Sequence, residues 1–185
     1  MRLDHIAFRV HDRKKAVEFI KSSLGYIVAD EFDLQFDDGS ITKCYAMSPP
    51  EKQNKIGDIV TIPWIMYSSG INEPVEHHLA PEIFVSEGDA DSIVGKWVES
   101  RGGNGGIHHI AYQVNDIDQV VAKWRDLGVE FLSEEVIDCP EDDLRQIFTK
   151  PLALLGDIII EMIERGEKGF CRNSVKDLMN STKEV

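Results

Sequence analysis

Cysteine is scarce in this sequence, and long apolar runs are missing. The three cysteines, Cys44, Cys139 and Cys171, are an odd number without a close pair. They indicate neither a disulfide framework nor a zinc ribbon, so we expect a reducing, cytoplasmic location. No run approaches the roughly 18 apolar residues of a membrane span, and Met1 leads directly into a predicted strand. We therefore expect neither a membrane span nor a signal peptide.

Basic residues are also in short supply. The chain has 20 Lys and Arg against 33 Asp and Glu, which gives a formal net charge of −13. Nucleic acids and anionic membranes bind basic surfaces, so we expect neither as a partner. With 185 residues, 42% of them hydrophobic, the chain can form one domain or two small fused ones around a sizeable core.

Two segments of the chain share one pattern. Residues 3–10 read Leu-Asp-His-Ile-Ala-Phe-Arg-Val, and residues 105–114 read Gly-Gly-Ile-His-His-Ile-Ala-Tyr-Gln-Val. Alternation along a strand places His5 and His109 at equivalent positions, 104 residues apart, each followed by an alanine on the same face. The same rule places His108 on the opposite, outward face, where we expect a structural role. The repetition predicts a duplicated unit.

A helix follows each of these strands. The first is predicted from Asp12 to Leu24 and the second from about Asp116 to Leu127, each closed by a glycine. In the first half, further strands are predicted at Tyr26–Leu34 and Ile41–Ser48, and a third at either Ile59–Tyr67 or Leu79–Ser86, followed by a helix at Asp91–Ser100. In the second half, strands are predicted at Val129–Glu135, Leu144–Thr149 and Asp157–Ile163. A last helix is predicted at Gly169–Ser181, capped near Asn173 or Ser174.

These elements predict an α+β fold of two tandem βαβββ modules. The modules cover residues 1–100 and 107–185 and are joined by a Gly-rich linker at 101–106. We expect their strands to form one cupped mixed β-sheet with helices outside, plus a C-terminal helix.

Glu161 is the unusual residue of the last predicted strand. It shares a face with Ile159 and Ile163, where an ionised carboxylate is costly unless a positive group pairs with it. Together with His5 and His109 it could form a two-His-one-carboxylate metal site that leaves coordination positions open for substrate. The alternative is that both histidines are hydrogen-bonded core residues and Glu161 is an exposed carboxylate. The duplication favours the metal site, because packing gives no reason for the histidine to recur.

Other histidines are weaker candidates. His77 and His78 lie in a predicted loop before a strand, and His11 lies near a helix start, where we expect a surface residue. The three cysteines are interpreted as packing or incidental thiols.

The paired modules, opening Asp-His-Ile-Ala and His-His-Ile-Ala, resemble the vicinal oxygen chelate (glyoxalase/bleomycin resistance/dioxygenase) superfamily. Three segments further resemble the catalytic C-terminal half of 4-hydroxyphenylpyruvate dioxygenase: Leu144-Arg-Gln-Ile-Phe-Thr-Lys-Pro151, Ile159-Ile-Glu-Met-Ile-Glu-Arg165 and Lys168-Gly-Phe170. The resemblance implies that His5, His109 and Glu161 bind a divalent metal. Fe(II) is expected, with Mn, Co, Zn or Ni as alternatives.

The same resemblance implies a substrate site. Gln146 matches a glutamine that faces the substrate, Phe170 matches a phenylalanine of a gating C-terminal helix, and Asn72 lies in a segment similar to the family's Asn-Glu-Pro. The implied activity is that of a non-haem Fe(II) dioxygenase. Its partners are a 2-oxo acid or another bidentate oxygen ligand, which chelates the metal, and O2. A homodimer is compatible with this interpretation.

Two other functions stay open. The region from Val94 to Ala111 equally resembles methylmalonyl-CoA epimerase, and epimerases and glyoxalases of this superfamily supply a fourth metal ligand from the last strand of the first module. Ungapped alignment places Ile83 there, which favours the dioxygenase. A shift of one residue would place Glu82 there as a ligand or base, which favours an epimerase or lyase. The third candidate is a metal-free protein that sequesters a ligand.

Overall fold

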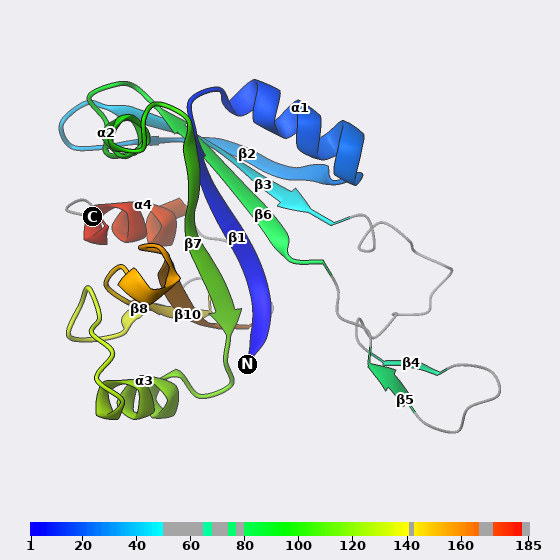
Figure 1. Ribbon diagram of the computed structural model, residues 1–185, viewed down its shortest axis with the longest axis vertical. Coiled ribbons are helices and arrows are strands. Elements are labelled where there is room, and N and C mark those ends of the chain that lie inside the picture. The colour runs from blue at the N-terminus through cyan, green and yellow to red at the C-terminus, as the bar shows by residue number, and fades with distance from the viewer. Residues whose placement is uncertain (50–64, 68–73, 77–79, 141–142, 167–171, 183–185) are drawn as a thin grey trace.

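The computed structural model describes residues 1–49, 65–67, 74–76, 80–140, 143–166 and 172–182. Its main element is a curled eight-stranded mixed sheet with the order β2-β3-β6-β1-β7-β10-β9-β8 (Figure 1). The bounds of these strands are β1 Arg2–Val10, β2 Ile27–Gln35, β3 Ile41–Ser48, β6 Glu82–Gly88, β7 Gly105–Gln113, β8 Ile137–Cys139, β9 Leu144–Phe148 and β10 Ile159–Arg165. A separate pair, β4 (Ile65–Tyr67) and β5 (Pro74–Glu76), forms a two-stranded sheet.

The order of the strands is symmetric about the pair β1 and β7. These two strands run antiparallel, and each is followed on its other side by a parallel strand, β6 or β10. Each half of the sheet therefore repeats the other, as the duplicated pattern predicts. The α+β fold of paired βαβββ modules in one curled sheet is confirmed.

Helices α1 (Arg13–Leu24) and α3 (Ile117–Asp126) begin as the sequence predicts. Asp12 and Asp116 cap them by accepting hydrogen bonds from the backbone N–H of Lys15 and Gln119. Gly25, with φ of 75°, closes α1 in the left-handed conformation. Both helices pack against one face of the sheet, which we call the outer face.

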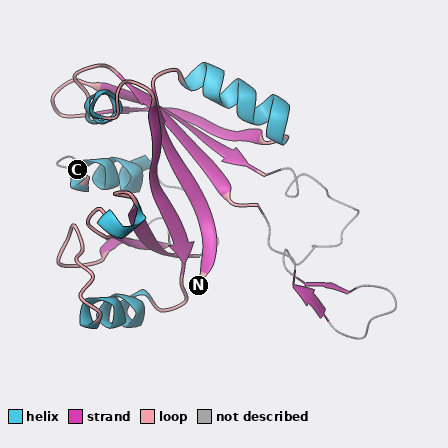
Figure 2. Cartoon of the chain, in the orientation of Figure 1, coloured by secondary structure: helices cyan, strands magenta, loops and turns pink. Residues whose placement is uncertain are grey.

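The inner face carries His5 and is covered by α2 (Ile93–Ser100) and α4 (Arg172–Ser181). Trp97 from α2 and Met179 from α4 pack with Phe148 and Ile159 of the sheet. The sheet curls around α4, while α1 lies on its other side (Figures 1 and 2). Burial of these apolar side chains encloses the inner face.

The structure corrects two predicted elements. Residues Val129–Glu135 form no strand; Phe131 makes only an isolated bridge with Thr149, and Ile137–Cys139 takes the edge position beside β9 instead. The C-terminal helix begins at Arg172, so the predicted caps Asn173 and Ser174 lie inside it. Within the described residues, no helix is both long and apolar enough to cross a membrane.

Candidate metal centre

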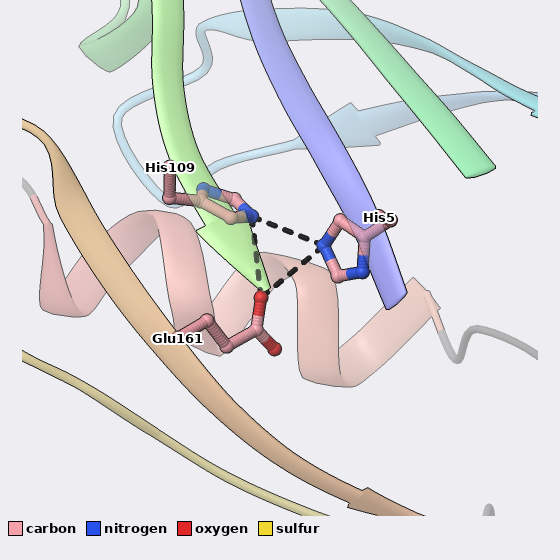
Figure 3. A group of neighbouring side chains, drawn as sticks. All are labelled: His5, His109 and Glu161. Atoms are coloured by element: carbon pink, nitrogen blue, oxygen red, sulfur yellow. Dashed lines mark hydrogen bonds and ion pairs between the residues drawn. The ribbon is translucent and has the colours of Figure 1, made fainter. Parts of the chain in front are cut away.

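Three neighbouring strands bring His5, His109 and Glu161 together on the inner face (Figure 3). His5 comes from β1, His109 from β7 and Glu161 from β10, and their exposed fractions are 2%, 3% and 1%. The two imidazole Nε2 atoms lie 3.2 Å apart, and each lies 3.2 Å from Oε2 of Glu161. The three predicted residues therefore form one compact, buried cluster.

A β-bulge in β7 determines how its two histidines lie. Ala7 of β1 pairs with His109 and Phe8 pairs with Ile107, so His108 is the extra residue. The bulge turns His108 toward the inner side, and the expectation that it faces outward is wrong. Its ring is buried, stands edge-on to Trp97 at 5.4 Å between centroids, and places Nδ1 2.8 Å from Nδ1 of His109.

A second bulge places Asp4 beside His5. Pairing shifts between Leu3 and His5, which leaves Asp4 outside the regular ladder. Its Oδ1 lies 2.8 Å from Nδ1 of His5 and also accepts a hydrogen bond from Arg165. A carboxylate at Nδ1 holds the proton there, which leaves Nε2 of His5 with a lone pair directed at the cluster. Asp4 is a site residue that the sequence pattern does not reveal, because regular alternation would place it on the face opposite His5.

The charges of the cluster are strongly coupled. Burial disfavours a charged imidazole at His5, but Glu161 and Asp4 outweigh it and raise the pKa of His5 to about 9. Burial also opposes ionisation of Glu161, yet the two histidines lower its pKa to about 2. Burial lowers the pKa of His109. Without a metal, His5 is therefore the positively charged imidazolium at neutral pH, and Glu161 is the ionised carboxylate that faces it.

The donor set fits a divalent metal ion. Oε2 of Glu161 is fully buried and accepts no hydrogen bond of normal geometry from the described residues, although both imidazoles lie at 3.2 Å. Three donor atoms separated by 3.2 Å can share one ion, because bonds of roughly 2.0–2.2 Å place neighbouring ligands roughly 3 Å apart. Two imidazoles and one carboxylate suit Fe, Mn, Co, Ni and Zn alike.

The strand register identifies the position opposite Glu161. Ala111 pairs with Glu161 across β7 and β10, and its counterpart Ala7 pairs with Phe84 across β1 and β6. Phe84, a buried inner-face residue, thus takes the place from which a symmetric fourth ligand would come.

Neither residue expected at that position occupies it. Ile83 packs against α1 on the outer face, so the placement by ungapped alignment is wrong. Glu82 pairs with His5 and shares its face, but its Oε2 lies 3.8 Å from Nη1 of Arg165 and it is no member of the cluster.

The other predicted site residues divide into two groups. Gln146 is buried in β9, where it pairs with Ile163 on the inner face, and its contact with a substrate stays a prediction. Phe170, Asn72 and the weaker candidates His77 and His78 lie outside the described residues.

A curled sheet of paired βαβββ modules with a His-His-Glu cluster inside defines a class of small half-barrel proteins with a candidate metal site. The sequence model of the Glyoxalase/Bleomycin resistance protein/Dioxygenase superfamily matches residues 4–148. The chain belongs to that superfamily.

Solved structures with the same fold include enzymes of different kinds. Methylmalonyl-CoA epimerase from Mycobacterium tuberculosis is 22% identical over 90% of this chain and 89% of that chain, with a TM-score of 0.59. A triple mutant of 4-hydroxymandelate synthase from Streptomyces coelicolor is 18% identical over 98% of this chain and 53% of that chain, with a TM-score of 0.73. A Streptomyces coelicolor methylmalonyl-CoA epimerase variant in complex with 2-nitronate-propionyl-CoA is 24% identical over 90% and 99%, with a TM-score of 0.54. At these identities the likeness establishes the fold.

Proposed function

We propose that the protein is a non-haem Fe(II) dioxygenase that acts on a 2-oxo acid. The observation that carries this proposal is Phe84 at the position symmetric to Glu161. A phenyl ring cannot bind the metal, so the described residues supply three ligands. An octahedral ion would keep three positions open, enough for a bidentate 2-oxo acid and O2.

Fe(II), held by His5, His109 and Glu161, would supply Lewis-acid polarisation of a chelated keto acid and a place for O2 to react. The chain's own residues prepare the site. Asp4 holds the proton of His5 on Nδ1, so that Nε2 faces the metal position. Phe84, Phe148 and Ile159 line the inner face near the cluster and keep water away. Gln146, Asn72 and Phe170 are proposed to contact the substrate.

A second candidate is an epimerase or lyase. Glu82 supports it, because this carboxylate shares the inner face with His5 and is partly exposed. If it left Arg165, it could bind the metal or remove a proton next to a carbonyl group.

Metal content and oxygen uptake test these candidates. The purified protein is loaded anaerobically with Fe(II), and in parallel with Mn, Co, Zn or Ni. We expect about one ion per chain, lost in Glu161→Gln. Glu164→Gln is the matched control and keeps the ion, because Glu164 points away from the cluster, toward Arg145 and the N–H of Ile117.

Oxygen consumption with a panel of 2-oxo acids then tests the reaction. Uptake by the Fe(II) protein supports the dioxygenase. No uptake, together with deuterium exchange next to a thioester carbonyl, would establish the epimerase instead. A protein that takes up no metal would contradict both and leave the ligand-sequestering function.

A further inference from the structure

Arg9 is a buried cation that the metal site does not use. It lies on the inner face of β1, two alternating positions beyond His5, and is 2% exposed. Its Nη2 donates to Oγ1 of Thr182, and its guanidinium lies 5.7 Å from the ring centre of Trp97. Its Nη1 is buried and has no hydrogen-bond partner in the part of the chain that the structure describes.

No carboxylate pairs with this guanidinium among the described residues. A hydroxyl and an aromatic face neutralise no charge, and a buried cation without an anion is costly. Burial lowers the pKa of Arg9 to about 9, so Arg9 stays charged at neutral pH. The other buried arginine of this half, Arg13, has Glu31 as its partner at 3.2 Å. Arg13 thus has the carboxylate partner expected of a structural arginine, whereas Arg9 has none among the described residues.

His108 adds a second orphaned donor beside Arg9. A metal on Nε2 of His109 requires the proton of His109 on Nδ1, which then donates to Nδ1 of His108 at 2.8 Å. His108 must consequently carry its own proton on Nε2. That nitrogen is buried and has no hydrogen-bond partner within the described ranges. The bulge places His108 across from Ala7 and Phe8, next to Arg9 in the sheet.

Arg9 lies on the same inner face as the three candidate metal ligands, and the bulge turns His108 toward that side. His5 and Arg9 are four residues apart on one strand, about 13 Å between Cα atoms, and both side chains project from the same face. Ala7 is the only side chain of β1 between them on that face, and its methyl group occupies little space.

We propose that Arg9 and His108 form a subsite for a carboxylate at the far end of the substrate, so that the substrate is a 2-oxo diacid. One end chelates the metal through its keto acid group. The other end accepts hydrogen bonds from Nη1 of Arg9 and Nε2 of His108. A guanidinium suits this task because its planar donors match the two oxygens of a carboxylate. The inference rests on the proposed metal site, which fixes the tautomer of His108.

Matched pairs of acids test this subsite without any mutation. 2-Oxoadipate and 2-oxohexanoate have the same chain length and differ only in the terminal carboxylate, and 2-oxosuberate and 2-oxooctanoate form a longer pair. Binding to the Fe(II) protein is measured anaerobically by calorimetry, so that no turnover occurs. We expect the better diacid to bind roughly 10- to 100-fold more tightly than its monoacid partner, as a buried charge-assisted hydrogen bond allows.

Arg9→Gln then assigns the preference to the guanidinium. We expect it to reduce diacid affinity to that of the monoacid, with metal stoichiometry as the measure that the site is intact. Arg101→Gln is the matched control, since Arg101 contacts the same Trp97 from the exposed surface, and it should keep the preference. If Arg9→Gln does not fold, Arg9→Lys should retain only part of the preference.

Two results would overturn the subsite. Equal affinities of the wild-type protein for diacid and monoacid in both pairs would contradict it, as would a preference that survives in Arg9→Gln. In either case normal metal uptake would leave the proposed function standing. Failure of the wild-type protein to bind metal would contradict the proposed function instead.

Discussion

Phe84 takes in one half of the sheet the place that Glu161 takes in the other. Each pairs with the alanine two residues after a cluster histidine, Ala7 for Phe84 and Ala111 for Glu161. The duplicated fold thus offers two register-equivalent positions on the inner face, and the chain places a carboxylate at only one of them. Because the other is apolar, the number of ligands, and with it the number of open coordination positions, depends on a single residue.

Supplying a ligand at Phe84 should close the site. Phe84→Glu is expected to keep the metal, because a further carboxylate adds a donor, but to reduce oxygen uptake with 2-oxo acids by roughly 10-fold or more, because one open position is filled. Phe84→Leu is the control, which stays apolar and should keep most of the activity. Oxygen electrode measurements on metal-matched samples decide this. Unchanged uptake in Phe84→Glu would show that Phe84 does not face the metal.

Asp4 should control metal affinity through His5. In Asp4→Asn the amide no longer attracts the proton of Nδ1 as a carboxylate does, so we expect metal affinity to fall roughly 10- to 100-fold. Asp12→Asn serves as the comparison, since asparagine caps a helix as well as aspartate and the capping bond to Lys15 can persist. Competition with a chelator gives both affinities. An equal loss in the two variants would mean that Asp4 acts only through general stability.

Metal binding should release a proton. The pKa of His5 is raised to about 9, from an ordinary 6.5, whereas that of Glu161 is lowered to about 2. Between pH 6.5 and 8 the metal therefore displaces the proton of His5 while Glu161 is already ionised. Apparent affinity should rise roughly tenfold per pH unit in this range and level off above the pKa of His5. Titration in buffers of different ionisation enthalpy measures the proton, and an affinity independent of pH would contradict the coupling.

Gly105 should tolerate no side chain at the start of β7. Its φ is +74°, and a Cβ there would lie 2.1 Å from the carbonyl oxygen of Arg9. Gly105→Ala combines this clash with a conformation that costs about 1 kcal/mol or more for alanine. Gly128→Ala has a similar φ of +84° but nothing within 4 Å, so it isolates the conformational cost. We expect Gly105→Ala to lower the free energy of unfolding further than Gly128→Ala, as urea denaturation would measure.

Much of the site follows from the sequence because repetition is visible there. The 104-residue spacing of His5 and His109, and the isolated carboxylate of Glu161, suffice to predict the cluster. The position of His108 does not follow, since strict alternation assumes a regular strand and a bulge depends on the partner strand. The faces of Glu82 and Ile83 depend on the register of β6 beside β1, which only the folded sheet determines.

Which segment forms the edge strand beside β9 is also not predictable from the sequence alone. Residues 129–135 and 137–139 are both plausible strands, but β9 has room for one partner along Leu144–Gln146, and Ile137–Cys139 occupies it. Competition for one row of hydrogen-bonding groups cannot be read from either segment alone.

The antiparallel pairing of β1 with β7 has a consequence for how the chain can be divided. Each of these strands would become an edge strand if the two halves were separated, with a row of unpaired N–H and C=O groups along nine residues. Such edges bind other strands indiscriminately and promote aggregation. The halves are alike in pattern, yet each protects the other from self-association, so the duplicated chain should fold as one cooperative unit.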